Sequence, residues 1–87
     1  MAHYHFEPTT IPETGAIINE YVFKSNTDPS KRVILVTDDV LHTPSRDGYT
    51  FVYECFAFPT RAHQFISAGC PAGGMWFDAP SMPTREV

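Results

Sequence analysis

The hydrophobic and polar positions along the chain predict short strands separated by turns. Residues 32–41 contain four consecutive aliphatic residues, and such a run is typical of a strand covered on both faces. Residues 16–24 and 49–58 are rich in β-branched and aromatic residues and are predicted as two further strands. Residues 75–78 predict a short C-terminal strand, and residues 2–7 an edge strand.

Two turns and one helix connect these strands. Residues 25–31 contain the Asn, Asp and Pro that favour a turn, and Asp47-Gly48 marks a second turn before residue 49. Residues 60–68 fit a two-turn helix that Thr60 caps and Gly69 ends, although a strand is the alternative there. A short helix opening near Pro12 is likewise the alternative to the strand at 16–24, and we favour the strand.

The strand at 49–58 is apolar on both sides. In regular alternation one face carries Tyr49, Phe51, Tyr53, Cys55 and Ala57, and the other carries Thr50, Val52, Glu54, Phe56 and Phe58. A solvated antiparallel sheet alternates apolar and polar residues. Terminal segments, a short helix or another copy of the chain must therefore cover the second face.

The predicted fold class is α+β and β-rich. We expect an antiparallel meander of 16–24, 32–41 and 49–58 with one short helix, either open or barrel-like. Residues 1–78 form one globular domain in this interpretation, and 79–87 form a Pro-containing tail.

Composition and charge narrow the function classes. The 87 residues include seven Phe, four Tyr and one Trp, and only two Leu, which favours strands over a helical bundle. This length excludes large cofactor-binding folds, and we expect no cofactor. The formal net charge of −4, with six scattered Lys and Arg, argues against nucleic acid as a partner.

The N-terminal segment and the two cysteines bear on the compartment. Residues 1–8 have neither the cationic start nor the apolar core of an export signal, and no apolar stretch reaches membrane-spanning length. Cys55 and Cys70 could form one bridge in an oxidising compartment. We expect a soluble cytoplasmic protein with two reduced thiols and no membrane partner.

Three carboxylates offer a catalytic hypothesis. If 32–41 pairs with 49–58 across Asp47-Gly48, Glu54 shares a face with either Asp38 or Asp39, whatever the register. Two such carboxyl groups suit acid/base hydrolysis, because proximity raises one pKa. Solvated carboxylates or pairs with nearby Arg are the simpler interpretation.

Histidine and cysteine provide weaker hypotheses. His3 and His5 are two residues apart and would point to one side of a strand, as a metal-chelating pair requires, with His42 or His63 completing the site. Cys70 lies in a glycine-rich loop, where His63 and Asp78 are the available partners for a nucleophile. Ordinary terminal histidines and a turn cysteine are the simpler interpretations.

The surplus of aromatic rings is the most informative feature of the chain. A thin sheet with few aliphatic residues buries so many rings only by closing into a barrel, and otherwise leaves an aromatic surface for a partner. We therefore expect a small binding or interaction module that acts as a homo-oligomer, or with another protein or a small apolar ligand. A hydrolase or lyase using Glu54 with Asp38 or Asp39 is the alternative, and a metal-binding protein using His3 and His5 is the second. The candidate interface residues are Tyr53, Phe56, Phe58, Trp76 and Phe77.

Overall fold

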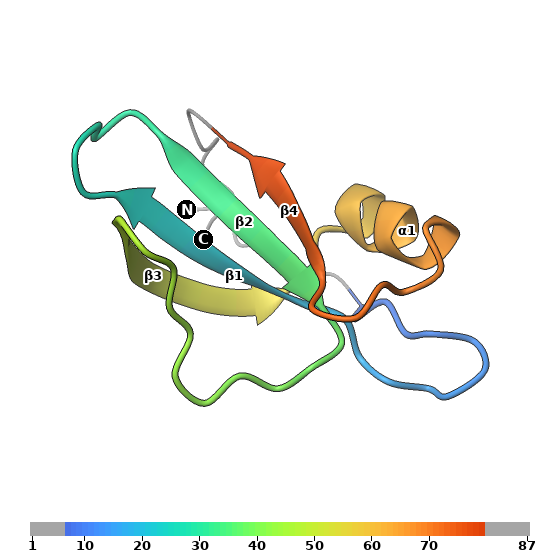
Figure 1. Ribbon diagram of the computed structural model, residues 1–87. Coiled ribbons are helices and arrows are strands. Elements are labelled where there is room, and N and C mark those ends of the chain that lie inside the picture. The colour runs from blue at the N-terminus through green and yellow to red at the C-terminus, as the bar shows by residue number, and fades with distance from the viewer. Residues whose placement is uncertain (1–6, 80–87) are drawn as a thin grey trace, which may run out of the picture.

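The computed structural model describes residues 7–79 as one four-stranded antiparallel sheet and one helix (Figure 1). The elements are β1 (Asn19–Ser25), β2 (Arg32–Thr37), β3 (Tyr49–Phe56), α1 (Pro59–Ser67) and β4 (Met75–Asp78). The predicted β-rich α+β class and its single short helix are confirmed. The barrel-like alternative is wrong, because the sheet is open, with β3 and β4 at its two edges.

The strands and the helix predicted between residues 16 and 78 exist, with shifted ends. The strand predicted at 32–41 ends at Thr37, because the Thr37 hydroxyl accepts the backbone N–H of Asp39 and turns the chain. The predicted cap at Thr60 is wrong: Pro59 fixes the backbone for the first helical turn, and Phe58 occupies the capping position. Gly69 has a φ of 89°, as the predicted helix end requires. The predicted strand at 2–7 lies outside the described residues except for Glu7, which is not in a strand.

The strand order differs from the predicted meander. The sheet runs β3-β1-β2-β4, so β3 pairs with β1 and not with β2 (Figure 1). Asp47-Gly48 forms its turn, and the N–H of Tyr49 donates to the carbonyl of Arg46 at 3.0 Å. This turn ends the 38–48 connection, which passes from β2 beyond β1 to β3, and does not close a hairpin.

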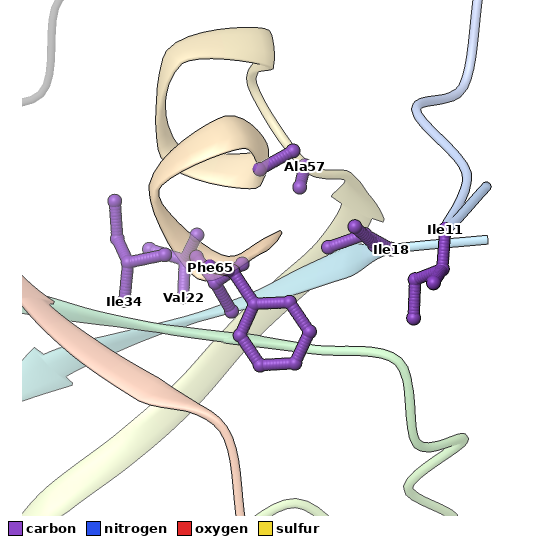
Figure 2. Close-up of a cluster of buried hydrophobic side chains, with 8 residues drawn as sticks. Ile11, Ile18, Val22, Ile34, Ala57 and Phe65 are labelled. Atoms are coloured by element: carbon purple, nitrogen blue, oxygen red, sulfur yellow. The ribbon is translucent and has the colours of Figure 1, made fainter. Parts of the chain in front are cut away.

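The face of the sheet that α1 covers, here the helix face, holds the larger core (Figure 2). Phe65 is fully buried against the strands, a burial that stabilises the fold by about 2 to 3 kcal/mol. The side of α1 that packs onto the sheet carries its two buried residues, Phe65 and Ala62. The buried cluster consists of Ile11, Ile18, Val22, Ile34, Val36, Ala57, Ala62 and Phe65.

The opposite face, here the crossover face, is covered by the 38–48 connection. Tyr21 anchors this connection, because its hydroxyl accepts the N–H of Leu41 at 3.0 Å and donates to the carbonyl of Asp39 at 3.3 Å. Arg46 adds cation–π contacts, with its guanidinium 5.0 Å from the Tyr49 ring centroid and 4.3 Å from that of Trp76. The second core cluster lies beneath and consists of Tyr21, Phe23, Val33 and Leu35. Thus α1 covers β1 and β2 on one face and this connection covers them on the other, whereas every residue of β3 remains at least partly exposed.

The turn between β1 and β2 is held by side-chain hydrogen bonds. The hydroxyl of Ser25 accepts the N–H groups of Thr27 and Asp28, and Asp28 accepts both the N–H and the hydroxyl of Ser30. The hydrogen bonds from Ser30, with Lys31 nearby, lower the pKa of Asp28. These hydrogen bonds hold the charged turn that connects β1 and β2 into a hairpin.

Gly74 provides a test of how closely the chain passes β2. A Cβ at Gly74 would lie 2.6 Å from the Val36 carbonyl oxygen and 2.7 Å from Leu35 Cδ1, whereas a Cβ at Gly73 would meet nothing within 4 Å. Both glycines have positive φ. We expect Gly73→Ala to cost about 1 to 2 kcal/mol from its backbone conformation, and Gly74→Ala to exceed about 4 kcal/mol because backbone must also move. Urea unfolding of both variants measures the difference, and equal costs would contradict the packing described.

Candidate functional site

The structure does not form the strand pairing from which the carboxylate pair was predicted. Glu54 lies opposite Tyr21 of β1, which separates β3 from β2, so the axes of β2 and β3 are roughly 10 Å apart. Asp38 and Asp39 lie beyond the end of β2 and not within it. The β2–β3 pairing on which the catalytic hypothesis depended is therefore wrong.

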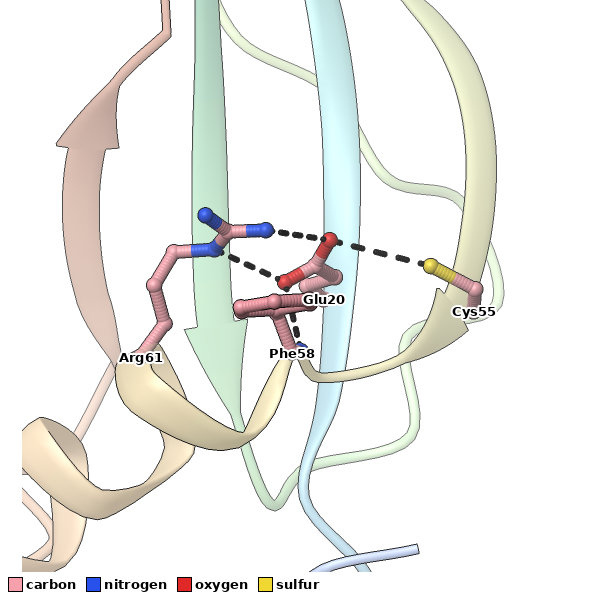
Figure 3. A network of polar contacts seen from close by, with 4 residues as sticks. All are labelled: Glu20, Cys55, Phe58 and Arg61. Atoms are coloured by element: carbon pink, nitrogen blue, oxygen red, sulfur yellow. Dashed lines mark hydrogen bonds and ion pairs between the residues drawn. The ribbon is translucent and has the colours of Figure 1, made fainter. Parts of the chain in front are cut away.

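The carboxylate that the fold does bury is Glu20, at the second position of β1 (Figure 3). Its side chain has no exposed surface and receives two hydrogen bonds from Arg61, Nε at 3.0 Å and Nη2 at 3.1 Å. The backbone N–H of Phe58 donates to Oε1 at 3.1 Å, and the thiol of Cys55 donates to Oε2 at 3.7 Å. One carboxylate thus joins β1, the end of β3 and the first turn of α1.

Physical chemistry explains why this group tolerates burial. A glutamate is almost never fully buried unless it is paired, and a bidentate guanidinium with a backbone N–H supplies charge and hydrogen bonds together. Such a pair adds little net stability over an apolar substitute, but removing one partner is costly. Glu20 therefore fixes where α1 starts relative to the sheet more than it strengthens the fold.

The sequence also contains a signal for Glu20, a carboxylate that was not among the predicted site residues. Strand residues two apart share a face, so a strand at 16–24 places Glu20 between Ile18 and Val22 on an apolar face. A charged residue between two core positions indicates a buried pair that needs a cation. Arg61, in the predicted helix, is that cation.

The described residues form no arrangement that supports the histidine or cysteine hypotheses. His3 and His5 lie outside the described residues. Among residues 7–79, no three His, Cys, Asp or Glu side chains gather closely enough to hold a metal ion. Cys55 and Cys70 are not joined by a disulfide bond, and Cys70 has a φ of 51° in its turn.

The five predicted interface aromatics divide between the two edges of the sheet. Tyr53 and Phe56 belong to β3 and Phe58 follows it, whereas Trp76 and Phe77 belong to β4. Phe77 packs against the core of the helix face, and the other four are exposed by a third or more. One continuous aromatic surface is therefore not formed, and β3 and β4 present separate candidates.

The outer edge of β3 is the larger candidate. β3 has eight residues, and within the described part of the chain it pairs with β1 alone. Val52 and Phe56 are each 44% exposed, and Glu54 is the one charged residue of the strand. An edge strand with this length and composition can accept another strand by main-chain hydrogen bonds.

An open groove lies between α1 and β4. Met75 and Phe77 form its apolar part, His63, Gln64 and Ser67 contribute polar groups, and its volume is about 670 Å³. The groove is open to solvent over most of its surface. Its size lies within the range of small-molecule sites, but its shape encloses little.

The burial of Glu20 predicts an asymmetry between two substitutions. Arg61→Met leaves a fully buried carboxylate without its cation and should cost about 3 to 5 kcal/mol. Glu20→Gln keeps the shape of the side chain and leaves Arg61 without its carboxylate. Because the Arg61 side chain is already 23% exposed, we expect a loss of about 1 to 3 kcal/mol in the free energy of unfolding.

The matched control for this pair is Arg46→Met. Arg46 contacts aromatic rings, so losing it should cost about 1 kcal/mol. Chemical unfolding of the three variants gives the comparison. A cost of Arg61→Met no greater than that of Arg46→Met would show that Glu20 does not depend on Arg61.

Comparison with known proteins adds no assignment to this geometry. Protein-family models, curated proteins and solved structures were each compared with the chain, and no significant match was found. Within residues 7–79, no helix is long and apolar enough to cross a membrane.

Proposed function

We propose that the chain is a small interaction module that self-associates through the outer edge of β3 and the side chains exposed along it. The observation that carries the proposal is an eight-residue edge strand with Val52 and Phe56 exposed and a single charge. Isolated exposed apolar residues are ordinary, but apolar residues exposed along an unpaired sheet edge favour pairing with another chain.

The protections common at sheet edges are sparse on β3. Natural edge strands are often kept short, or carry lysine, proline or several charges. β3 contains neither lysine nor proline, and one bulge at Val52 is its only irregularity. This composition supports β3 as a contact surface.

The opposite edge is a weaker candidate. β4 has four residues and ends at Asp78, which gives few main-chain groups for a partner. Trp76 is 42% exposed, yet it contacts Phe23 and Arg46 within its own chain. These contacts favour a role for Trp76 in holding the 38–48 connection.

Substitution of Phe56 by Asp tests the proposal. We expect the wild-type chain to form dimers reversibly with rising concentration, and Phe56→Asp to weaken their affinity by about tenfold or more, because it places a charge in the contact. Sedimentation equilibrium and native mass spectrometry measure this directly.

Val40→Asp is the control. Val40 is 69% exposed and lies on the 38–48 connection, outside β3. Val40→Asp therefore replaces another exposed apolar side chain with the same negative charge. The dimer affinity of the Val40→Asp variant should equal that of the wild-type chain. A wild-type chain that remains monomeric at its highest soluble concentration would contradict the proposal, as would equal weakening by both substitutions.

A further inference from the structure

The backbone of β3 shows which of its groups face outward. The N–H of Ala57 donates to the carbonyl of Ile18 on the β1 side at 3.0 Å. Because N–H and C=O groups alternate sides along a strand, Cys55 also faces β1, and Glu54 and Phe56 face the open edge.

The N-terminal half of β3 follows the same rule from its other end. Gly48 accepts the N–H of Asn26 at 3.0 Å and so faces β1. Thr50 then faces β1 as well, and Tyr49 and Phe51 direct their backbone groups to the open edge.

A bulge at Val52 lies between these two halves of β3 and determines which of their side chains share a face. Val22 pairs with Tyr53 and Phe23 pairs with Phe51, so Val52 is an extra residue in the ladder. The faces predicted from strict alternation are therefore wrong beyond this point. Tyr49 and Phe51 share the crossover face with Glu54 and Phe56, because Glu54 lies opposite Tyr21 and Phe56 lies opposite Asn19.

We propose that the partner of β3 is the β3 strand of a second copy, paired antiparallel about a two-fold axis beside Val52 and Tyr53. This inference rests on the proposed function and specifies its geometry. The register places Tyr49 opposite Phe56, Phe51 opposite Glu54 and Thr50 opposite Cys55. The two-fold axis is perpendicular to the sheet, and two four-stranded sheets become one of eight strands.

Three observations favour this register. It uses the whole length of β3, and it matches outward-facing backbone groups with one another in both halves. The side chains of each opposed pair also share a face, because the bulge shifts one half by one residue. Tyr49 and Phe56 then form an aromatic cross-strand pair, which is a favourable combination.

The charges of the two copies are complementary in this arrangement. Glu54 of one copy meets the N-terminal half of the other β3, where Arg46 lies over the Tyr49 ring on the same crossover face. The register also keeps the two Glu54 side chains from opposing each other. Like charges directly opposite would destabilise the pair.

Disulfide formation in the Thr50→Cys variant, made in a Cys70→Ser background, tests the register. The introduced thiol and the natural Cys55 would occupy a non-hydrogen-bonded pair, about 4.5 Å apart at Cα, which a disulfide can bridge. Within one chain they are separated by about 17 Å, so the bond must join two chains. With oxidised glutathione, which is reduced as the two thiols are oxidised, we expect a covalent dimer whose cross-linked peptide contains both positions.

Two controls set the specificity. Lys24→Cys in the same background places a thiol one strand further from the edge, roughly 10 Å from the partner's Cys55, too far to bridge. Adding Cys55→Ser to Thr50→Cys should abolish the dimer band. Cross-linking as efficient for Lys24→Cys as for Thr50→Cys would overturn the register.

A measurement on the unsubstituted chain keeps the inference testable if Thr50→Cys fails to fold. In a mixture of labelled and unlabelled protein, intermolecular nuclear Overhauser effects are expected between the rings of Tyr49 and Phe56. A wild-type dimer that lacks both this signal and the Thr50→Cys cross-link would refute the register and leave self-association standing. A wild-type monomer would refute both proposals.

Discussion

The buried carboxylate of Glu20 is the constraint on which the arrangement of the other elements depends. Its bonds to Arg61, to the Phe58 N–H and to the Cys55 thiol join β1, β3 and α1 at one point (Figure 3). A buried carboxylate tolerates few alternative placements of its partners, since each one lost leaves an unsatisfied charge. The end of β3 and the start of α1 are therefore positioned together.

This constraint, together with the aromatic residues of β1, determines which side of the sheet β3 occupies. Tyr21 and Phe23 both contact the ring of Phe51, with centroids 6.3 and 5.7 Å apart. β3 thus packs beside β1, the 38–48 connection crosses one face to reach it, and the other side of β3 is left at the sheet edge. The candidate interface is a consequence of the strand order.

Local patterns in the sequence predicted the individual strands and the helix well. They predicted poorly which strands pair with one another. The apolar run of β2, the helix near 60–68 and the strand at 75–78 could be predicted because each depends on neighbouring residues. The partner of β3 could not, because Asp47-Gly48 forms the same turn whether it closes a hairpin or ends a connection. The bulge at Val52 gave no local signal, yet it reverses the faces of half the strand.

The candidate site was predicted in part for the same reason. Composition indicated an excess of exposed aromatic side chains, and Phe56 and Trp76 are indeed exposed. Which of them share a surface depends on strand order, and β1 and β2 separate the two groups. Glu20 could have been found from parity alone, because Ile18 and Val22 flank it on a core face.

Hydrogen exchange at individual backbone amides, measured across protein concentration, tests most directly whether chains meet at the β3 edge. The amides of Glu54 and Phe56 face the open edge, whereas the amide of Ala57 donates to the Ile18 carbonyl within its own chain. If β3 strands pair between chains, exchange at Glu54 and Phe56 slows as concentration rises, and exchange at Ala57 does not change. Rates at Glu54 and Phe56 that stay constant while the chain self-associates would contradict this pairing.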